Sequence, residues 1–200
     1  MAARLSLLEA ELEIVEGTSQ SLSPELLEGI ARFRHKVFIE TLGWDLATKA
    51  GMELDQFDRA DTIYVAARGE DGRLAGAARL LPTNRPYLLA EVFPELMGGA
   101  QPPHSADVWE LSRFAAVDFD GARVHPLRQF SSPVTVGLLR EVLRVAASHG
   151  VSRLITVSPL GVERLLRRLG VAAHRAAPPL VVDGQALFAC WIEVQGSLSS

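Results

Sequence analysis

The spacing of apolar residues predicts strands and helices that alternate along the chain. Apolar positions recur every three or four residues after Ser23, which predicts a helix over 24–42 with Ser23 as N-cap and Gly43 at its end. The same spacing predicts helices over 133–149 and 159–169. Runs rich in β-branched and other apolar residues predict strands at 12–17, 62–69, 73–83, 106–118, 152–158 and 178–194.

Two Asp-Gly pairs predict hairpins. Asp71-Gly72 separates two strand-like runs, and Asp183-Gly184 divides the last one. The helix between two strands of the second half forms a βαβ unit. The order of elements therefore predicts an α/β fold, with a mixed sheet covered by helices in three layers, α-β-α. This arrangement resembles the acyltransferase fold, which binds a thioester donor in a splayed cleft of the sheet.

Length and composition are typical of a single domain with a substantial core. The chain has 200 residues, of which 48% are hydrophobic. Its N-terminal stretch carries acids at Glu9, Glu11 and Glu13, unlike a signal peptide, and no run of 18 apolar residues occurs. The single cysteine, Cys190, fits a reducing compartment, so we expect a cytoplasmic protein with no membrane partner.

Charge is distributed unevenly along the chain. Residues 1–120 carry 11 Lys and Arg against 20 Asp and Glu, whereas residues 121–177 carry 9 Arg against two acids, although the whole chain has a net charge of only -4. A basic segment on an acidic protein indicates an anionic partner, or simply solvated helix surfaces. That segment contains one aromatic residue, Phe130, so we do not expect nucleic-acid binding.

Several catalytic classes lack their sequence signals. There is no G-x-S-x-G elbow, P-loop or dinucleotide fingerprint. No two of the five histidines have metal-ligand spacing. Cys190 lies in the apolar run "LFACWIEV", which is typical of a buried structural thiol rather than a nucleophile.

The strongest signal from the residues is a set of charges in apolar surroundings. Such arginines are costly to bury unless a carboxylate pairs with them. The arginines are Arg34, Arg79 and Arg113, and the available acids are Glu53, Asp55, Asp58 and Glu110. Three interpretations remain open: a structural ion-pair network that holds the loop 45–61 on the sheet, a polar ligand site, or a divalent metal site, although the spacing of the acids lacks the glycine of a calcium loop.

Together these residues resemble the acyl-homoserine-lactone synthases, the autoinducer synthases of bacterial quorum sensing. The resemblance runs from about residue 25 to residue 170. It rests on an ordered set of motif residues: Arg34, Phe38, Trp44, Asp55, Asp58, Arg79 and the run Glu110-Leu111-Ser112-Arg113-Phe114. A generic coenzyme A-dependent N-acyltransferase is the alternative function, and a binding module that keeps the fold is a third.

The resemblance implies a complete reaction. The amine of S-adenosylmethionine attacks an acyl thioester, usually on acyl carrier protein, and the carboxylate then closes on the γ-carbon to release methylthioadenosine. S-adenosylmethionine is a substrate, so neither a cofactor nor a metal is expected. The resemblance also implies a division of the single domain, with residues 1–120 binding S-adenosylmethionine and residues 121–200 binding the acyl chain and its carrier.

Roles for individual residues follow from the resemblance. Glu53 and Glu110 are the candidate bases, and Asp55 and Arg113 complete the catalytic set. S-adenosylmethionine would contact a mixed polar and aromatic set: Arg34, Phe38, Trp44, Asp55, Asp58, Arg79, Phe93, Arg113 and Phe114.

The second half would receive the donor. We expect the acyl chain to contact Val136, Leu139, Val157, Ser158 and Leu160. Serine at 158 leaves the oxidation state at C3 of the acyl chain open. The acidic carrier protein would dock on Arg140, Arg144, Arg164, Arg167 and Arg168, whereas coenzyme A would need phosphate ligands such as Arg123 and Arg128.

Overall fold

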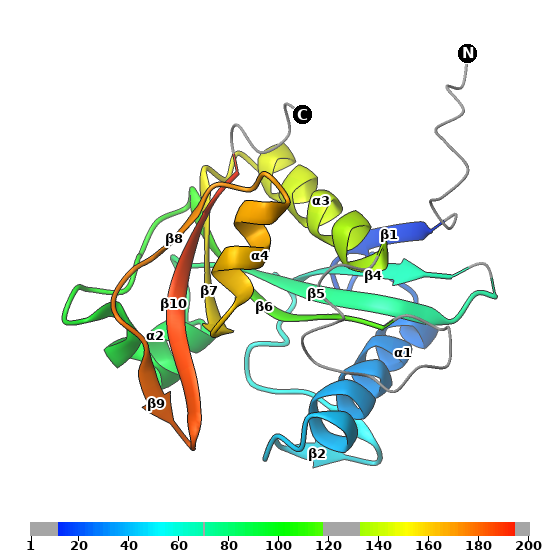
Figure 1. Ribbon diagram of the computed structural model, residues 1–200. Helices are drawn as coiled ribbons and strands as arrows, with labels where there is room; N and C mark the ends of the chain where they lie inside the picture. The colour runs from blue at the N-terminus through cyan, green and yellow to red at the C-terminus, as the bar shows by residue number, and fades with distance from the viewer. Residues whose placement is uncertain (1–11, 70, 118–132, 195–200) are drawn as a thin grey trace.

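A computed structural model describes residues 12–69, 71–117 and 133–194 (Figure 1). One mixed sheet runs through them in the order β1-β4-β5-β6-β7-β10-β8, with β9 paired to β10. Its strands are β1 (Glu13–Gly17), β4 (Ile63–Arg68), β5 (Leu74–Pro82), β6 (Val108–Ala116), β7 (Arg153–Pro159), β8 (Ala173–Arg175), β9 (Leu180–Val182) and β10 (Gln185–Glu193). A separate small hairpin joins β2 (Thr48–Lys49) and β3 (Met52–Glu53).

Helices cover both faces of the sheet, as the sequence predicts. α3 (Pro133–Ser148) and α4 (Val162–Arg168) contribute to the large apolar core on one face. α1 (Pro24–Arg34) and the short α2 (Leu88–Val92) lie on the other, each over its own apolar cluster, and the 3-10 turn η2 (Pro94–Met97) follows α2. In Figure 1, α3 lies above β4 and β5, and α1 lies below them. Within the described ranges, no helix has the length and apolar character needed to cross a membrane.

Both predicted hairpins form. β4 and β5 are antiparallel around Gly72, whose φ of 75° lies in the left-handed region. Asp183 and Gly184 have φ of 48° and 77° between β9 and β10, as a two-residue hairpin turn requires. Ser23 caps α1 as predicted, since its hydroxyl accepts a hydrogen bond from the Leu26 backbone N–H at 3.2 Å.

The first predicted helix is wrong in its second half. The α-helix ends at Arg34, and residues His35–Thr41 form a π-helix, η1, before the chain turns at Gly43. The apolar spacing is similar in the two kinds of helix over so few residues, so the sequence pattern did not distinguish them.

The sheet splays between β6 and β7, which is the cleft that the fold class predicts. The two strands are parallel and pair only from Val108 with Arg153 to Glu110 with Ile155. β6 then continues to Ala116 and β7 to Pro159 without pairing further. Glu110 therefore lies at the apex of a V-shaped opening in the sheet.

A bulge in β6 changes which face its side chains occupy. Arg79 pairs with Ser112 and Ala77 with Ala115, so β6 carries one extra residue over that interval. Arg113 has a φ of 52°, in the left-handed region. As a result Ser112 and Arg113, although consecutive, both reach the face that α1 covers, while Phe114 packs against the core under α3.

Candidate active site

Three arginines and three carboxylates form a closed ring of alternating charge on the face that α1 and α2 cover. The residues come from α1, the segment 53–58, β5 and the β6 bulge. We call this set the charge ring: Arg34, Glu53, Arg113, Asp55, Arg79 and Asp58. The ring confirms the predicted pairing of buried arginines with the acids of 53–58.

One half of the ring links α1 to β6. Arg34 Nε lies 2.5 Å from Glu53 Oε2, and Arg113 Nη2 lies 2.9 Å from both Glu53 Oε1 and Asp55 Oδ2. Both oxygens of Glu53 therefore already accept hydrogen bonds from guanidinium groups.

The other half runs through β5. Arg79 donates to both oxygens of Asp55, at 2.6 and 3.1 Å, and its Nη1 lies 3.2 Å from Asp58 Oδ1. Arg34 closes the ring by donating to both oxygens of Asp58, at 2.7 and 3.1 Å. Burial opposes ionisation of Asp58, but hydrogen bonding and attraction from Arg34, together with the charge of Arg79, outweigh it and hold its pKa far below the ordinary value.

The ring is most accessible at Asp55. The side chains of Arg34, Arg79 and Glu53 are each 1% exposed, whereas those of Arg113, Asp58 and Asp55 are 6%, 7% and 13% exposed. A polar ligand can therefore reach this neutral set of charges most directly at Asp55, which pairs with Arg113.

Glu110 does not join the ring, contrary to the prediction that it could pair with an arginine. Its two carboxylate oxygens accept hydrogen bonds from the backbone N–H groups of Leu88 and Leu89, at 3.1 and 2.7 Å, at the start of α2. Burial raises the pKa of Glu110 to about 7, although these two N–H groups and the more distant arginines favour the charged form.

Of the predicted aromatic residues, one pair flanks the ring and two lie away from it. Phe38 stacks on Trp44 with ring centroids 4.9 Å apart, and the guanidinium carbon of Arg113 lies 5.8 Å from the Phe38 centroid. Phe93 lies elsewhere, half-buried in the cluster beside α2 that contains Phe57. Phe114, on the opposite face of the sheet, is separated from the ring by the β6 bulge.

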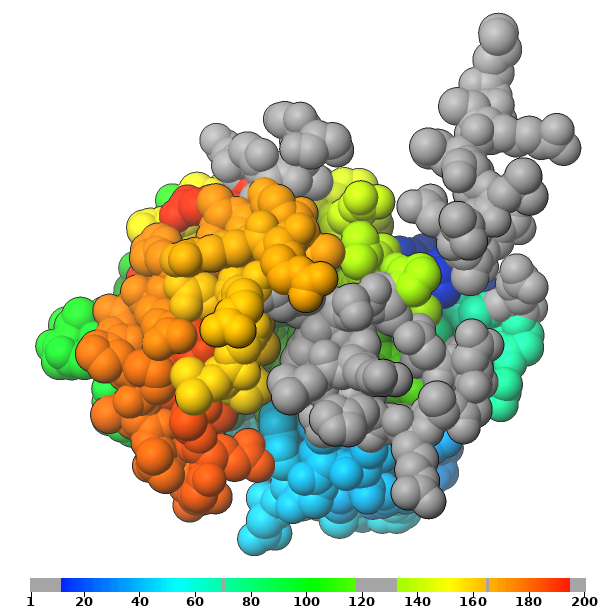
Figure 2. Space-filling model, viewed as in Figure 1, coloured from blue at the N-terminus to red at the C-terminus, as the bar shows by residue number. Residues whose placement is uncertain are grey.

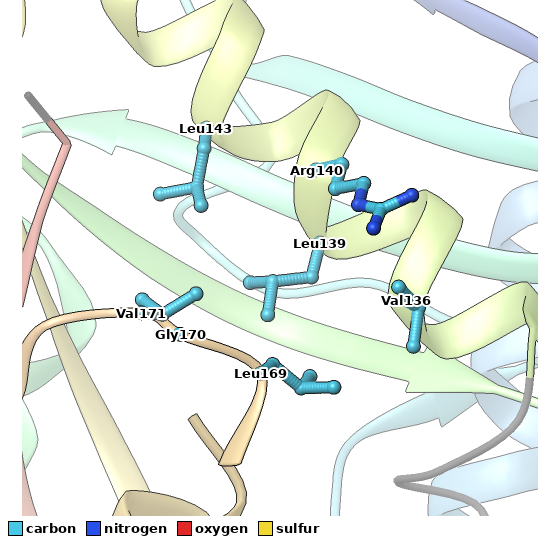
Figure 3. Close-up of a pocket in the computed structure, with 7 residues that line it drawn as sticks. All are labelled: Val136, Leu139, Arg140, Leu143, Leu169, Gly170 and Val171. Atoms are coloured by element: carbon cyan, nitrogen blue, oxygen red, sulfur yellow. The ribbon is translucent and has the colours of Figure 1, made fainter. Parts of the chain in front are cut away.

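The predicted acyl residues divide between the two faces of the sheet. Val136 and Leu139 of α3 line a pocket with Arg140, Leu143, Leu169, Gly170 and Val171, and Figure 3 shows the aliphatic side chains of α3 directed towards the turn after α4. Ser158 is buried, whereas Val157 packs on the α2 side and Leu160 is 45% exposed. The predicted residues thus do not form one surface.

The predicted docking arginines are exposed on α3 and α4, which lie side by side on the face shown in Figure 2. Their partners differ. Arg144 pairs with Glu16 and Glu141, and Arg167 pairs with Glu163. Among the described residues, Arg164 and Arg168 have no ion-pair partner. Arg123 and Arg128 lie outside the described residues.

Two residues to which the sequence analysis gave no role in the site hydrogen-bond to the ring. The Ser112 hydroxyl accepts a hydrogen bond from Arg79 Nε at 3.0 Å, and the Tyr64 hydroxyl donates to Asp58 at 2.9 Å. Tyr64 lies directly opposite Arg79 in the β4–β5 hairpin. The hairpin register, counted from Asp71-Gly72, could have identified it.

Comparison with known sequences assigns the family. A family model described as autoinducer synthase matches residues 19–197. The acyl-homoserine-lactone synthase of Acinetobacter nosocomialis is 48% identical over 183 residues, which cover 92% of this chain and 100% of that protein. The same enzyme of Ralstonia solanacearum is 47% identical and matches 84% of this chain and 82% of its own.

Solved structures agree in fold. The crystal structure of TofI in a ternary complex with an inhibitor and MTA is 40% identical, with a TM-score of 0.79, covering 93% of this chain and 94% of that one. The structure of BjaI, a CoA-dependent acyl-homoserine lactone synthase, with SAM and isopentyl-CoA is 25% identical, with a TM-score of 0.79, covering 94% and 85%. This chain therefore belongs to the autoinducer synthase family of acyl-homoserine-lactone synthases.

Proposed function

We propose that the chain joins an acyl group to S-adenosylmethionine beside the charge ring and then closes the lactone. The observation that carries the residue assignment is that Asp55, the most exposed member of the ring, pairs with Arg113, which lies beside the Phe38–Trp44 stack. Asp55 would bind the substrate ammonium and Arg113 its carboxylate. The aromatic pair would enclose the sulfonium and the adenosine, which favours cation–π attraction.

The first step makes an amide. The deprotonated amine attacks the thioester carbonyl, and the tetrahedral intermediate expels the thiolate, which takes up a proton. Beyond Glu110, the edge of β6 that faces β7 pairs with no strand in the part of the chain that the structure describes. Its backbone N–H groups are therefore well placed to bind the oxyanion of the intermediate.

Glu110 is the better candidate base of the two carboxylates predicted. Glu53 is occupied by two guanidinium groups, whereas Glu110 accepts from two backbone N–H groups at the apex of the cleft. A base whose pKa lies near the working pH combines the ionised form with proton affinity. Glu110 would accept the ammonium proton directly or through water.

This assignment predicts a pH dependence. With a pKa of about 7, raised from 4.5, Glu110 ionises as the pH rises through 7, so kcat/KM should rise over that interval. The raised pKa also makes the free energy of unfolding depend on pH, because the folded state favours the protonated form of Glu110. This contribution to stability is complete below about pH 4.5 and is lost as the pH rises through about 7. Glu110→Gln should abolish the rise of kcat/KM through pH 7. If kcat/KM of that variant still rises through pH 7, another group accepts the proton.

The second step releases the nucleoside. A carboxylate oxygen of the amide product attacks the γ-carbon, the carbon–sulfur bond breaks, and the sulfonium leaves as neutral methylthioadenosine. Arg113 would orient that carboxylate through its planar guanidinium.

We propose acyl carrier protein as the donor's carrier, because the exposed arginines of α3 and α4 would attract an acidic protein. The two arginines of α4 without ion-pair partners among the described residues, Arg164 and Arg168, are four residues apart and share one side of that helix. Arg167, which Glu163 already neutralises, should contribute less.

Reversing the two α4 charges tests this docking surface. Arg164→Glu with Arg168→Glu should raise KM for a carrier-bound donor about tenfold at low salt, because steering is lost, and the difference should shrink at high salt. KM for S-adenosylmethionine should not change. Arg32→Glu with Arg73→Glu makes the same charge change on α1 and after the β4–β5 turn. An equal rise in that control would show a general charge effect instead of docking.

The pocket between α3 and the turn after α4 is the proposed site for the distal part of the acyl chain. Two of its lining residues, Val136 and Leu143, lie seven residues apart, which corresponds to about 10 Å along α3. Leu143→Trp should lower kcat/KM about tenfold for the longest donor accepted and leave short donors unaffected, since overpacking an apolar site costs about 1–3 kcal/mol. Leu143→Met, which nearly conserves volume, is the matched control. An unchanged preference for chain length would place the acyl chain elsewhere.

One assay tests the proposed function. The protein is incubated with S-adenosylmethionine and a series of acyl-carrier and acyl-CoA thioesters, and methylthioadenosine and acyl-homoserine lactone are measured. Formation of both supports the proposal and identifies the preferred donor. Acetyl transfer to other amines without methylthioadenosine would support the generic N-acyltransferase, and tight donor binding without turnover would support a binding module.

A further inference from the structure

The π-helix η1 connects the charge ring to the aromatic pair. Arg34, its N-cap, contributes to the ring, and Phe38 lies within it and stacks on Trp44. π-helical turns are rare, and they occur frequently at functional sites. A seven-residue π segment at this position therefore calls for a physical explanation.

Two side-chain contacts in η1 have a spacing that fits only the π register. The Thr41 hydroxyl donates to the Lys36 carbonyl at 2.9 Å, and His35 Nδ1 lies 3.2 Å from Glu40 Oε1. Both contacts join residues five apart. In an α-helix, side chains five residues apart point about 140° away from each other, and a Thr hydroxyl bonds the carbonyl three or four residues back, so neither contact would form as it does here.

The backbone after η1 depends on the same register. The Leu42 N–H donates to Val37, five residues back, and the Trp44 N–H donates to the Phe38 carbonyl, six residues back, at 2.9 Å. This last bond attaches the backbone of Trp44 to that of Phe38 and leaves their rings parallel to within 23°. An α-helical turn has one residue fewer and would rotate Trp44 away.

We propose that Thr41 and the His35–Glu40 pair are positioning residues for S-adenosylmethionine. They hold η1 in its π register and so present Phe38 and Trp44 as one aromatic wall beside Arg113. This inference rests on the proposed function. Neither Glu40, which is 59% exposed, nor Thr41 belongs to the charge ring or the aromatic wall.

A matched pair of variants separates positioning from helix stability. Glu40→Ala with Thr41→Val removes both contacts and should raise KM for S-adenosylmethionine about fivefold, with KM for the acyl donor unchanged. Glu28→Ala removes an exposed contact in the α-helical part, the ion pair of Glu28 and Arg32 at 2.8 Å, and should leave both constants unchanged. If the two variants change KM for S-adenosylmethionine by the same factor, the proposal is overturned.

Deleting Glu40 is the stronger test, because it removes the extra residue and lets the α-helix continue. Binding of methylthioadenosine, followed by tryptophan fluorescence, should weaken at least tenfold while the circular dichroism of the fold is kept. Binding as tight as in the unchanged protein would refute the role of the π register. If the deletion prevents folding, the proposal is judged on the KM of the variant Glu40→Ala with Thr41→Val. If the unchanged protein does not bind methylthioadenosine, the proposed function fails, and that result is distinct from either outcome for the variants.

Discussion

Arg34→Ala is expected to lower the free energy of unfolding by about 3–5 kcal/mol, because removing one partner from a buried ionic network leaves the others uncompensated. Arg34 is 1% exposed and bonds both Glu53 and Asp58. Its loss leaves two buried carboxylates short of a donor. For a chain of this size, such a loss corresponds to a fall in Tm of about 10 °C, measurable by calorimetry.

A neighbouring arginine is the natural control. Arg32 lies two residues earlier on α1, is 53% exposed and, among the acidic side chains of the described ranges, pairs only with Glu28, so Arg32→Ala should cost well under about 1 kcal/mol. A double-mutant cycle of Arg34→Ala and Asp58→Asn should give a coupling energy above about 1 kcal/mol. If Arg34→Ala lowers the free energy of unfolding no more than Arg32→Ala does, water solvates the charge ring in solution.

Arg113→Lys should lower kcat/KM for S-adenosylmethionine about 100-fold, equal to about 2.7 kcal/mol of transition-state stabilisation. Arg113 contacts Glu53 and Asp55 at once, and Asp55 is the most exposed member of the ring. Lysine keeps the charge but lacks the planar fork that can bind two carboxylates and still orient a third. Steady-state release of methylthioadenosine measures the effect.

Two further measurements locate that effect. KM for the acyl donor should change little, because Arg113 is assigned to the methionyl end of the substrate. Arg144→Lys, an exposed position on α3, provides the same substitution away from the ring and should be nearly silent. If Arg113→Lys lowers kcat/KM for S-adenosylmethionine less than threefold, a positive charge alone is sufficient at position 113.

Much of the fold followed from local patterns. Asp71-Gly72 and Asp183-Gly184 predicted both long hairpins, and Ser23 with Pro24 predicted the start of α1. These features are local, since a turn or a cap depends on a few neighbouring residues. The short elements α2, β2, β3 and β8 were missed, because segments of two to five residues carry too little periodicity to detect.

The sequence by itself determined that Arg34, Arg79 and Arg113 need carboxylate partners, since burial of an unpaired guanidinium is too costly, and that the available acids are Glu53, Asp55, Asp58 and Glu110. Only the tertiary structure decided how they pair. The bulge in β6 turned Arg113 towards the ring and Phe114 away from it, and the packing of the start of α2 brought the N–H groups of Leu88 and Leu89 to Glu110. Such pairings depend on one residue of register and on contacts between residues far apart in sequence, which a linear pattern does not encode.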